Sequence, residues 1–166
     1  MDESAFRVFY EHTAGPLLRY LLGMAGRQDI AEDLLQETYC RFLTARLRNM
    51  DERQLRSYLF RIATNLMRDR WRSSKGEPTL EIPVDIVSPS PHPDRGLGVR
   101  QAFHRLKTRE RQLLWLAYVE GSNHQEIADS TGLGAASIRM LLFRARHRLA
   151  QLIGKNSPAT SPKVSE

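Results

Sequence analysis

A predicted pair of helices joined by a short glycine turn constrains this chain more than any other feature. The stretch 123–152 reads NHQEIADSTGLGAASIRMLLFRARHRLAQL. Asn123 can cap the first helix, and Glu126, three residues later, is placed to complete a capping box with it. Gly132 can then end that helix, because glycine adopts the left-handed conformation at little steric cost. The pattern therefore predicts two short helices that meet at a turn.

The apolar positions of this stretch predict how the two helices cross. Four apolar residues share one face of the second helix, spaced four, three and four positions apart: Ile138, Leu142, Ala145 and Leu149. Ala128, Gly132 and Ile138 fit a steep crossing, the helix-turn-helix arrangement whose second helix enters the major groove of DNA. The outer face of that helix is basic and carries Arg139, Arg144, Arg146, His147 and Arg148. A solvated basic helix in an ordinary bundle is the alternative interpretation.

Charge and composition limit the classes of protein that fit. The 166 residues suffice for one domain or two small ones, and a formal net charge of +6 favours a polyanionic partner. The single cysteine, Cys40, argues against an internal disulfide or a cysteine-rich metal site, and we expect it to pack partly in a helix interface. The first residues lack the basic and apolar regions of a secretory signal, and no apolar run is long enough to span a membrane. We therefore expect no membrane insertion and a cytoplasmic location.

Helical periodicity runs through both halves of the chain. It predicts an all-α fold of two small helical domains, residues 1–73 and 95–154. The intervening segment 74–94 holds five prolines and is predicted to be a flexible linker. Residues 155–166 are small and polar, which is typical of a disordered tail.

Three helix boundaries can be predicted from capping and breaking residues. Gly15-Pro16 is expected to kink or break the first helix. Asp29 can cap the second helix. Thr108 is expected to cap a later one, with Arg111 standing where a capping box would prefer an acid.

Two further helical faces could bind partners. The helix 52–72 combines arginines with Asn65 and with aromatic residues such as Tyr58, and these side chains suit phosphates and unpaired bases. A solvated arginine face is the more frequent explanation of that pattern taken alone. The helix 29–45 carries an acidic face that a DNA-binding protein would have to keep away from DNA. A basic protein partner would use it, although a solvated face is the default interpretation.

The sequence contains no recognisable catalytic motif. The five histidines are scattered without metal-ligand spacing, and no glycine-rich phosphate loop or nucleophile elbow is found. We therefore expect a protein that is not an enzyme and uses no metal or cofactor.

Three segments together resemble one family. The segments 31–43 (AEDLLQETYCRFL), 58–72 (YLFRIATNLMRDRWR) and 109–149 (beginning RERQLLWLAYVEG) are similar to bacterial sigma factors of the sigma-70 family. The likeness is to the extracytoplasmic-function (ECF) subgroup, which has only regions 2 and 4. It covers most of both halves and leaves out the linker and tail.

This resemblance implies roles for particular residues. It implies that the acidic face docks on the β′ coiled coil of core RNA polymerase through Asp33, Gln36 and Glu37. It implies that the −10 element is melted and read by the residues Arg48, Asn49, Met50, Tyr58, Arg61, Asn65, Asp69 and Arg72. It implies that the −35 duplex is read by Ala136, Ser137, Arg139, Met140, Phe143 and Arg144.

The chain departs from the family pattern at three places. Leu106-Lys107-Thr108 stands where Leu-Pro is usual, and Gly134 replaces the serine that caps the recognition helix. Met140-Leu141 replaces a Ser-Arg pair, which removes a potential phosphate contact and makes the groove-facing surface more apolar.

The resemblance implies a dissociable specificity subunit of RNA polymerase that binds the β′ and β subunits and promoter DNA. An anti-sigma factor is the implied regulator. A stand-alone helix-turn-helix repressor or activator is the alternative. The acidic face and the Asn65 helix argue against it, because a repressor needs neither a coiled-coil dock nor a single-strand reader.

Overall fold

The computed structural model describes residues 1–73 and 93–156, and these residues form helices without any strand. The prediction of an all-α fold is confirmed. The predicted linker lies almost entirely, and the predicted tail largely, outside the described residues. The helices are α1 (Glu3–Ala25), α2 (Gln28–Thr44), α3 (Glu52–Ser73), α4 (Pro93–Arg105), α5 (Thr108–Tyr118), α6 (His124–Thr131) and α7 (Ala135–Asn156).

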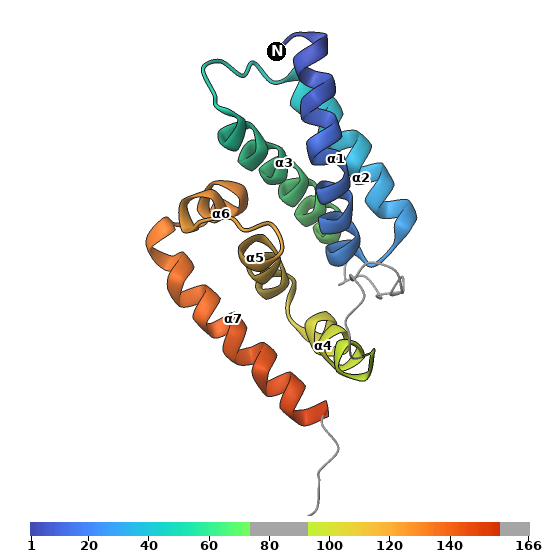
Figure 1. Ribbon diagram of the computed structural model, residues 1–166, viewed down its shortest axis with the longest axis vertical. Helices are drawn as coiled ribbons and strands as arrows, with labels where there is room; N and C mark the ends of the chain where they lie inside the picture. Colours follow the sequence, from blue (N-terminus) through green and yellow to red (C-terminus); the bar gives the residue numbers. More distant parts are fainter. Residues whose placement is uncertain (74–92, 157–166) are drawn as a thin grey trace, which may run out of the picture.

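Helices α1, α2 and α3 pack side by side and bury aromatic side chains between them (Figure 1). Phe9 stacks on Phe42 with 5.1 Å between ring centroids. The Thr13 hydroxyl donates to the Phe9 carbonyl and so accepts from the Tyr39 hydroxyl, 2.7 Å away. Burial raises the pKa of Tyr39 to about 12, so this buried pair stays neutral and fully hydrogen-bonded.

The predicted break of the first helix at Gly15-Pro16 does not occur, and the prediction that Asp29 caps the second helix is wrong. Helix α1 continues through Pro16, because the turns beyond it bury Leu17 and Leu21 completely and this packing outweighs one lost hydrogen bond. Helix α2 begins at Gln28 after Arg27, so Asp29 lies in the first turn and does not cap it. Both carboxylate oxygens of Asp29 accept from the Arg27 guanidinium, at 3.1 and 2.7 Å.

In the second half, α4, α5 and α6 all pack against α7. Thr108 is the first residue of α5 and not its cap, so the acid of the first turn is Glu110, which accepts from the Lys107 amide at 3.0 Å. Because the helix starts one residue earlier than predicted, Arg111 does not occupy the position where a capping box needs an acid. Its guanidinium is buried and donates to the carbonyls of His104 and Leu106, at 3.0 and 3.3 Å, and so satisfies the end of α4.

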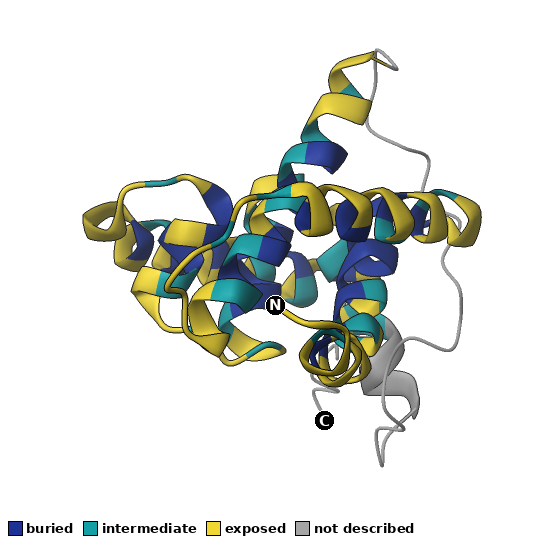
Figure 2. Cartoon of the chain, turned by 90° about the horizontal axis from the view of Figure 1, so that it is seen from above, coloured by how far each residue is buried: buried dark blue, intermediate teal, exposed yellow. Residues whose placement is uncertain are grey.

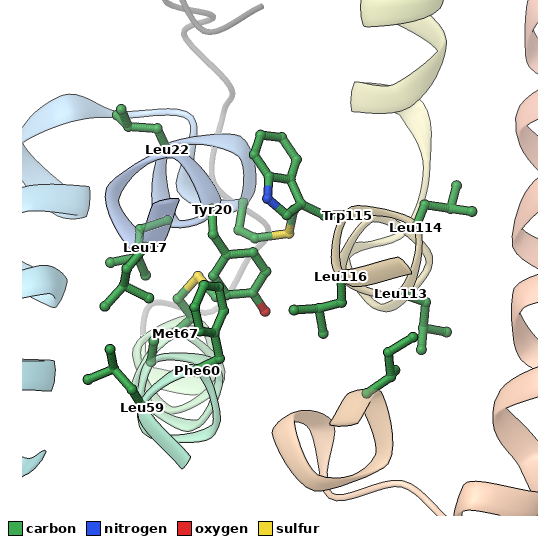
Figure 3. Close-up of a cluster of buried hydrophobic side chains, with 14 of the residues drawn as sticks. Leu17, Tyr20, Leu22, Leu59, Phe60, Met67, Leu113, Leu114, Trp115 and Leu116 are labelled. Carbon is green, nitrogen blue, oxygen red and sulfur yellow. The ribbon is translucent and has the colours of Figure 1, made fainter. Parts of the chain in front are cut away.

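The two halves share a continuous core, because α6 packs along α3 and α5 packs against α1. Figure 3 shows Trp115 and Leu116 of α5 extending toward Tyr20 and Phe60. A Cβ atom at Gly23 would lie only 2.7 Å from Cζ3 of Trp115, so only glycine permits this approach.

Polar contacts border this junction. Arg56 forms an ion pair with the nearly buried Glu120, and its guanidinium lies 5.4 Å from the centroid of the Phe60 ring. The Ser130 hydroxyl donates to the Ser57 carbonyl at 3.4 Å. In Figure 2 the buried residues line the inner faces of the helices and the exposed ones their outer faces. The outer faces therefore carry the candidate binding surfaces.

Candidate DNA-binding and protein-docking surfaces

Helices α6 and α7 form the predicted helix-turn-helix. The Glu126 amide donates to Oδ1 of Asn123 at 2.9 Å, and the Asn123 amide donates to Oε2 of Glu126 at 2.8 Å, which completes the predicted capping box. Gly132 ends α6 with φ 73° and ψ 14°, and its amide donates to the Ala128 carbonyl at 2.8 Å. The turn predicted from the sequence is confirmed.

Helix α7 has one buried face and one exposed face. Ile138, Leu142 and Ala145 are buried, and Leu149 is half-buried, as the spacing predicts. All six residues predicted to read the −35 element are exposed on α7: Ala136, Ser137, Arg139, Met140, Phe143 and Arg144. Arg146 does not belong to this open surface, since its guanidinium donates to the Tyr118 hydroxyl of α5 at 2.8 Å.

A second candidate surface lies along α3. Five predicted −10 residues recur every three or four positions and therefore share one side of the helix: Tyr58, Arg61, Asn65, Asp69 and Arg72. Arg61, Asp69 and Arg72 are exposed, whereas Tyr58 and Asn65 are half-buried. The carboxamide oxygen of Asn65 accepts from the Arg68 guanidinium at 2.7 Å, which leaves its NH₂ group available to donate.

The remaining three −10 residues lie in the loop before α3, next to the Tyr58 end of that helix. Arg48, Asn49 and Met50 are exposed, and Asn49 has a left-handed backbone with φ 56°. An open hollow of about 340 Å³ lies beside this loop, lined by Met1, Phe42, Leu43, Ala45, Leu47, Asn49, Met50 and Leu55. The sequence does not single out this hollow, because its lining combines Met1, the end of α2, the loop and the first turn of α3.

The acidic surface of α2 is formed by Asp33, Gln36 and Glu37, all of them exposed. Nε of Arg41 lies 2.7 Å from Oε1 of Glu37, one turn away. Cys40 is also exposed, so the prediction that it packs in a helix interface is wrong. Its neighbour Tyr39 occupies the buried position instead, since a larger apolar side chain gains more from burial.

Sequence reasoning missed an apolar hollow between α5 and α7. It measures about 460 Å³ and is lined by Phe103, Leu114, Trp115, Tyr118, Val119, Arg146, Leu149, Ala150 and Ile153. Val119 and Tyr118 stand out from its edge, 58% and 62% exposed. The sequence signal for this hollow is the broad apolar surface of α5, which exceeds what one packed face requires and is formed by Leu113, Leu114, Leu116, Ala117 and Tyr118.

The described residues include no group of three or more metal-ligating side chains. Among these residues no helix combines the length and the apolar character that a membrane crossing requires.

Comparison with known proteins agrees with this arrangement. Residues 9–77 match Sigma-70 region 2 and residues 97–149 match Sigma-70, region 4. The chain is 28% identical over 153 residues to the ECF RNA polymerase sigma factor SigM of Bacillus subtilis, covering 88% of this chain and 93% of SigM. It is 31% identical over 139 residues to an RNA polymerase sigma-E factor of Streptomyces antibioticus, covering 81% and 77% of the two chains.

A solved structure shows the same fold. The sigma factor RpoE of Bartonella quintana, crystallised with the anti-sigma factor NepR, aligns with a TM-score of 0.66 and 20% identity over 92% of this chain and 99% of that chain. The two matched regions fall on the two helical halves, and each half carries one of the candidate nucleic-acid surfaces described above. The chain belongs to the sigma-70 family and is a sigma factor of its ECF subgroup.

Proposed function

We propose that this protein directs promoter-specific initiation by binding core RNA polymerase, reading a −35 duplex with α7 and melting and reading a −10 element with α3. The observation that supports this proposal is the presence of two chemically different nucleic-acid surfaces on one chain. The α7 surface carries exposed arginines on the solvent-facing side of the second helix of a helix-turn-helix, the element with which such proteins read duplex DNA. The α3 surface combines exposed arginines, a half-buried tyrosine and Asn65, which suits an unstacked base, and an open hollow lies beside the loop that precedes α3.

Run-off transcription tests the proposal as a whole. The full chain is added to core polymerase on a genomic promoter library, and specific transcripts are expected only when both are present. A repressor would bind DNA without polymerase and would yield no specific transcript, so the same experiment separates the two functions.

The acidic surface of α2 is the proposed dock for the β′ coiled coil. Glu37→Lys is expected to weaken the affinity for core polymerase at least tenfold, because it places a positive charge where a basic partner must bind. Exposed substitutions seldom change the free energy of unfolding by more than about 0.5 kcal/mol, so the fold should persist. The affinity is measured with fluorescently labelled protein and purified core enzyme.

Glu11→Lys is the matched control, because it makes the same charge change at an exposed position of α1. It should bind core polymerase as the parent does. Full affinity of Glu37→Lys would remove this face from the docking site.

The apolar hollow between α5 and α7 is the proposed contact for the β subunit. Its lining is almost wholly apolar, and such hollows accept the apolar face of a partner helix. An anti-sigma factor that covered the same hollow would compete with polymerase, which gives a physical route for the proposed regulation.

Simultaneous reading of both elements requires the two halves to separate. The −35 and −10 elements are named for positions about 25 base pairs apart, which is roughly 85 Å of duplex. A compact chain of this length has a radius of gyration of only about 15 Å, so it cannot reach both elements at once. The α3–α6 junction and the Gly23–Trp115 contact must therefore open when polymerase and promoter bind.

Arg139 is the proposed phosphate contact of α7, because it lies at the side of the exposed face and not at its centre. Arg139→Ala is expected to weaken binding to all sequences alike and to lower the salt slope of log K by about 0.9. Holoenzyme binding to a promoter duplex is measured at several salt concentrations. Lys107→Ala, an exposed cation at the start of α5, is the control. An unchanged slope and affinity would remove Arg139 from the site.

A further inference from the structure

The outermost line of α7 carries no arginine or lysine and presents two large apolar side chains, although the helix as a whole is basic. Ala136, Met140, Phe143 and His147 follow one another at intervals of four, three and four residues, opposite the buried line of Ile138, Leu142 and Ala145. We call these four residues the α7 ridge. Met140 is 55% exposed and Phe143 is 59% exposed. Two large apolar side chains thus face solvent on the side of the helix that is farthest from its own core.

Two residues of the ridge contact each other. The Phe143 ring stacks on the His147 imidazole one turn later, with 6.4 Å between centroids and 9° between ring planes. This contact favours the orientation in which the phenyl ring lies along the ridge. A preorganised side chain loses less conformational entropy on binding than a mobile one.

The surroundings of the ridge indicate which partner covers it. Exposed arginines flank it, Arg139 on one side and Arg144 and Arg148 on the other, and the chain has no acidic residue from Ile138 to Lys155. An apolar line between two basic sides complements the major groove, where phosphates border the base edges on both sides. The only apolar group on those base edges is the C5 methyl group of thymine.

We propose that Met140 and Phe143 read thymine methyl groups in the upstream promoter element, so that this protein selects thymine at two positions by apolar contact and not by hydrogen bonding. This inference rests on the proposed function of α7 and names the chemistry of its ligand. Met140 lies in the second turn of α7, near the helix end that enters the groove, and Phe143 follows one turn later on the same line. The two methyl groups should therefore belong to neighbouring base pairs.

The test compares thymine with uracil, which differs only by lacking this methyl group. Holoenzyme containing the full chain selects its preferred upstream sequence from a promoter duplex with a randomised upstream segment. The selected duplex is then made with deoxyuridine in place of each thymine in turn. Burying a methyl-sized group contributes about 0.8 kcal/mol, so each contacted thymine should lose about fourfold in affinity on replacement.

Two variants assign the methyl groups to side chains. With Met140→Ala the loss of affinity caused by uracil should vanish at one position, and with Phe143→Ala at the other. Once a side chain has been removed, removing the methyl group that it contacted should have no further effect. Val8→Ala is the matched control, since Val8 is an apolar residue 52% exposed on α1, and it should keep both penalties. Circular dichroism checks that each variant is folded. The uracil substitutions measured with the parent protein test the proposal even if a variant fails to fold.

The outcomes are distinguishable. Enrichment of a sequence without any uracil penalty would overturn the thymine inference and leave the proposed function in place. A uracil penalty that persists in both variants, together with weaker binding of the variants to polymerase, would make the ridge a protein-binding surface and would also overturn it. Failure of the holoenzyme to enrich any sequence would contradict the proposed function itself.

Discussion

Replacing Trp115 by alanine is expected to lower the free energy of unfolding by about 3–5 kcal/mol, which is the usual cost of removing a large buried aromatic side chain. Trp115 is 9% exposed and lies in the core that the two halves share, against Gly23 of α1 and 6.1 Å from the Phe103 ring. Its loss would open a cavity at the junction of α1 and α5. Urea unfolding followed by far-ultraviolet circular dichroism measures the change.

Gly23→Ala supplies a sharper version of the same test. In the parent protein the added Cβ would lie 2.7 Å from Cζ3 of Trp115, and overpacking of this kind costs about 1–3 kcal/mol. In the Trp115→Ala background the space is free, and alanine should then stabilise the interior of α1 by up to about 1 kcal/mol relative to glycine. The sign of the effect should therefore reverse.

The control is Val119→Ala, at a position 58% exposed just beyond α5. It should change the free energy of unfolding by no more than about 0.5 kcal/mol. Two results would show that the halves do not pack together through Trp115. One is a loss of unfolding free energy in Trp115→Ala as small as that of the control. The other is a change of the same sign for Gly23→Ala in both backgrounds.

Asn65→Ala is expected to leave core binding and closed-complex formation nearly intact but to suppress promoter opening. Asn65 would donate a hydrogen bond to an unstacked base with its free NH₂ group, and removing this donor leaves the base acceptor unsatisfied, which costs about 1–3 kcal/mol. That range corresponds to roughly a 5-fold to 150-fold smaller open fraction. Permanganate reactivity of thymines near the start site measures the opening.

A promoter with a pre-melted −10 bubble should recover part of this loss. Unstacking a base costs a few kcal/mol, and the bubble removes that cost before the protein binds. Gln101→Ala is the control, because it removes an exposed amide side chain from α4. If Asn65→Ala opens a duplex promoter as readily as the parent does, Asn65 is a structural residue that only anchors Arg68.

Local sequence patterns determined the elements and the exposed faces of this protein. The helix-turn-helix followed from Asn123, Glu126 and Gly132, because capping and the left-handed conformation depend on residues within one or two turns. The spacing of apolar residues in α3 and α7 fixed which side of each helix is buried. It therefore assigned Asn65 to the polar side of α3 and Met140 to the outer side of α7, where the structure leaves them half-buried and exposed.

The tertiary structure decided what covers each buried face. An apolar face does not specify its partner, so the approach of Trp115 to Gly23 and the pairing of Arg56 with Glu120 could not be read from local patterns. Pro16 remains inside α1 for the same reason, since packing from other helices outweighs the local penalty. The hollow beside Met50 likewise exists only because distant segments meet there. Local patterns thus specify elements within a few turns, whereas long-range packing determines how those elements combine.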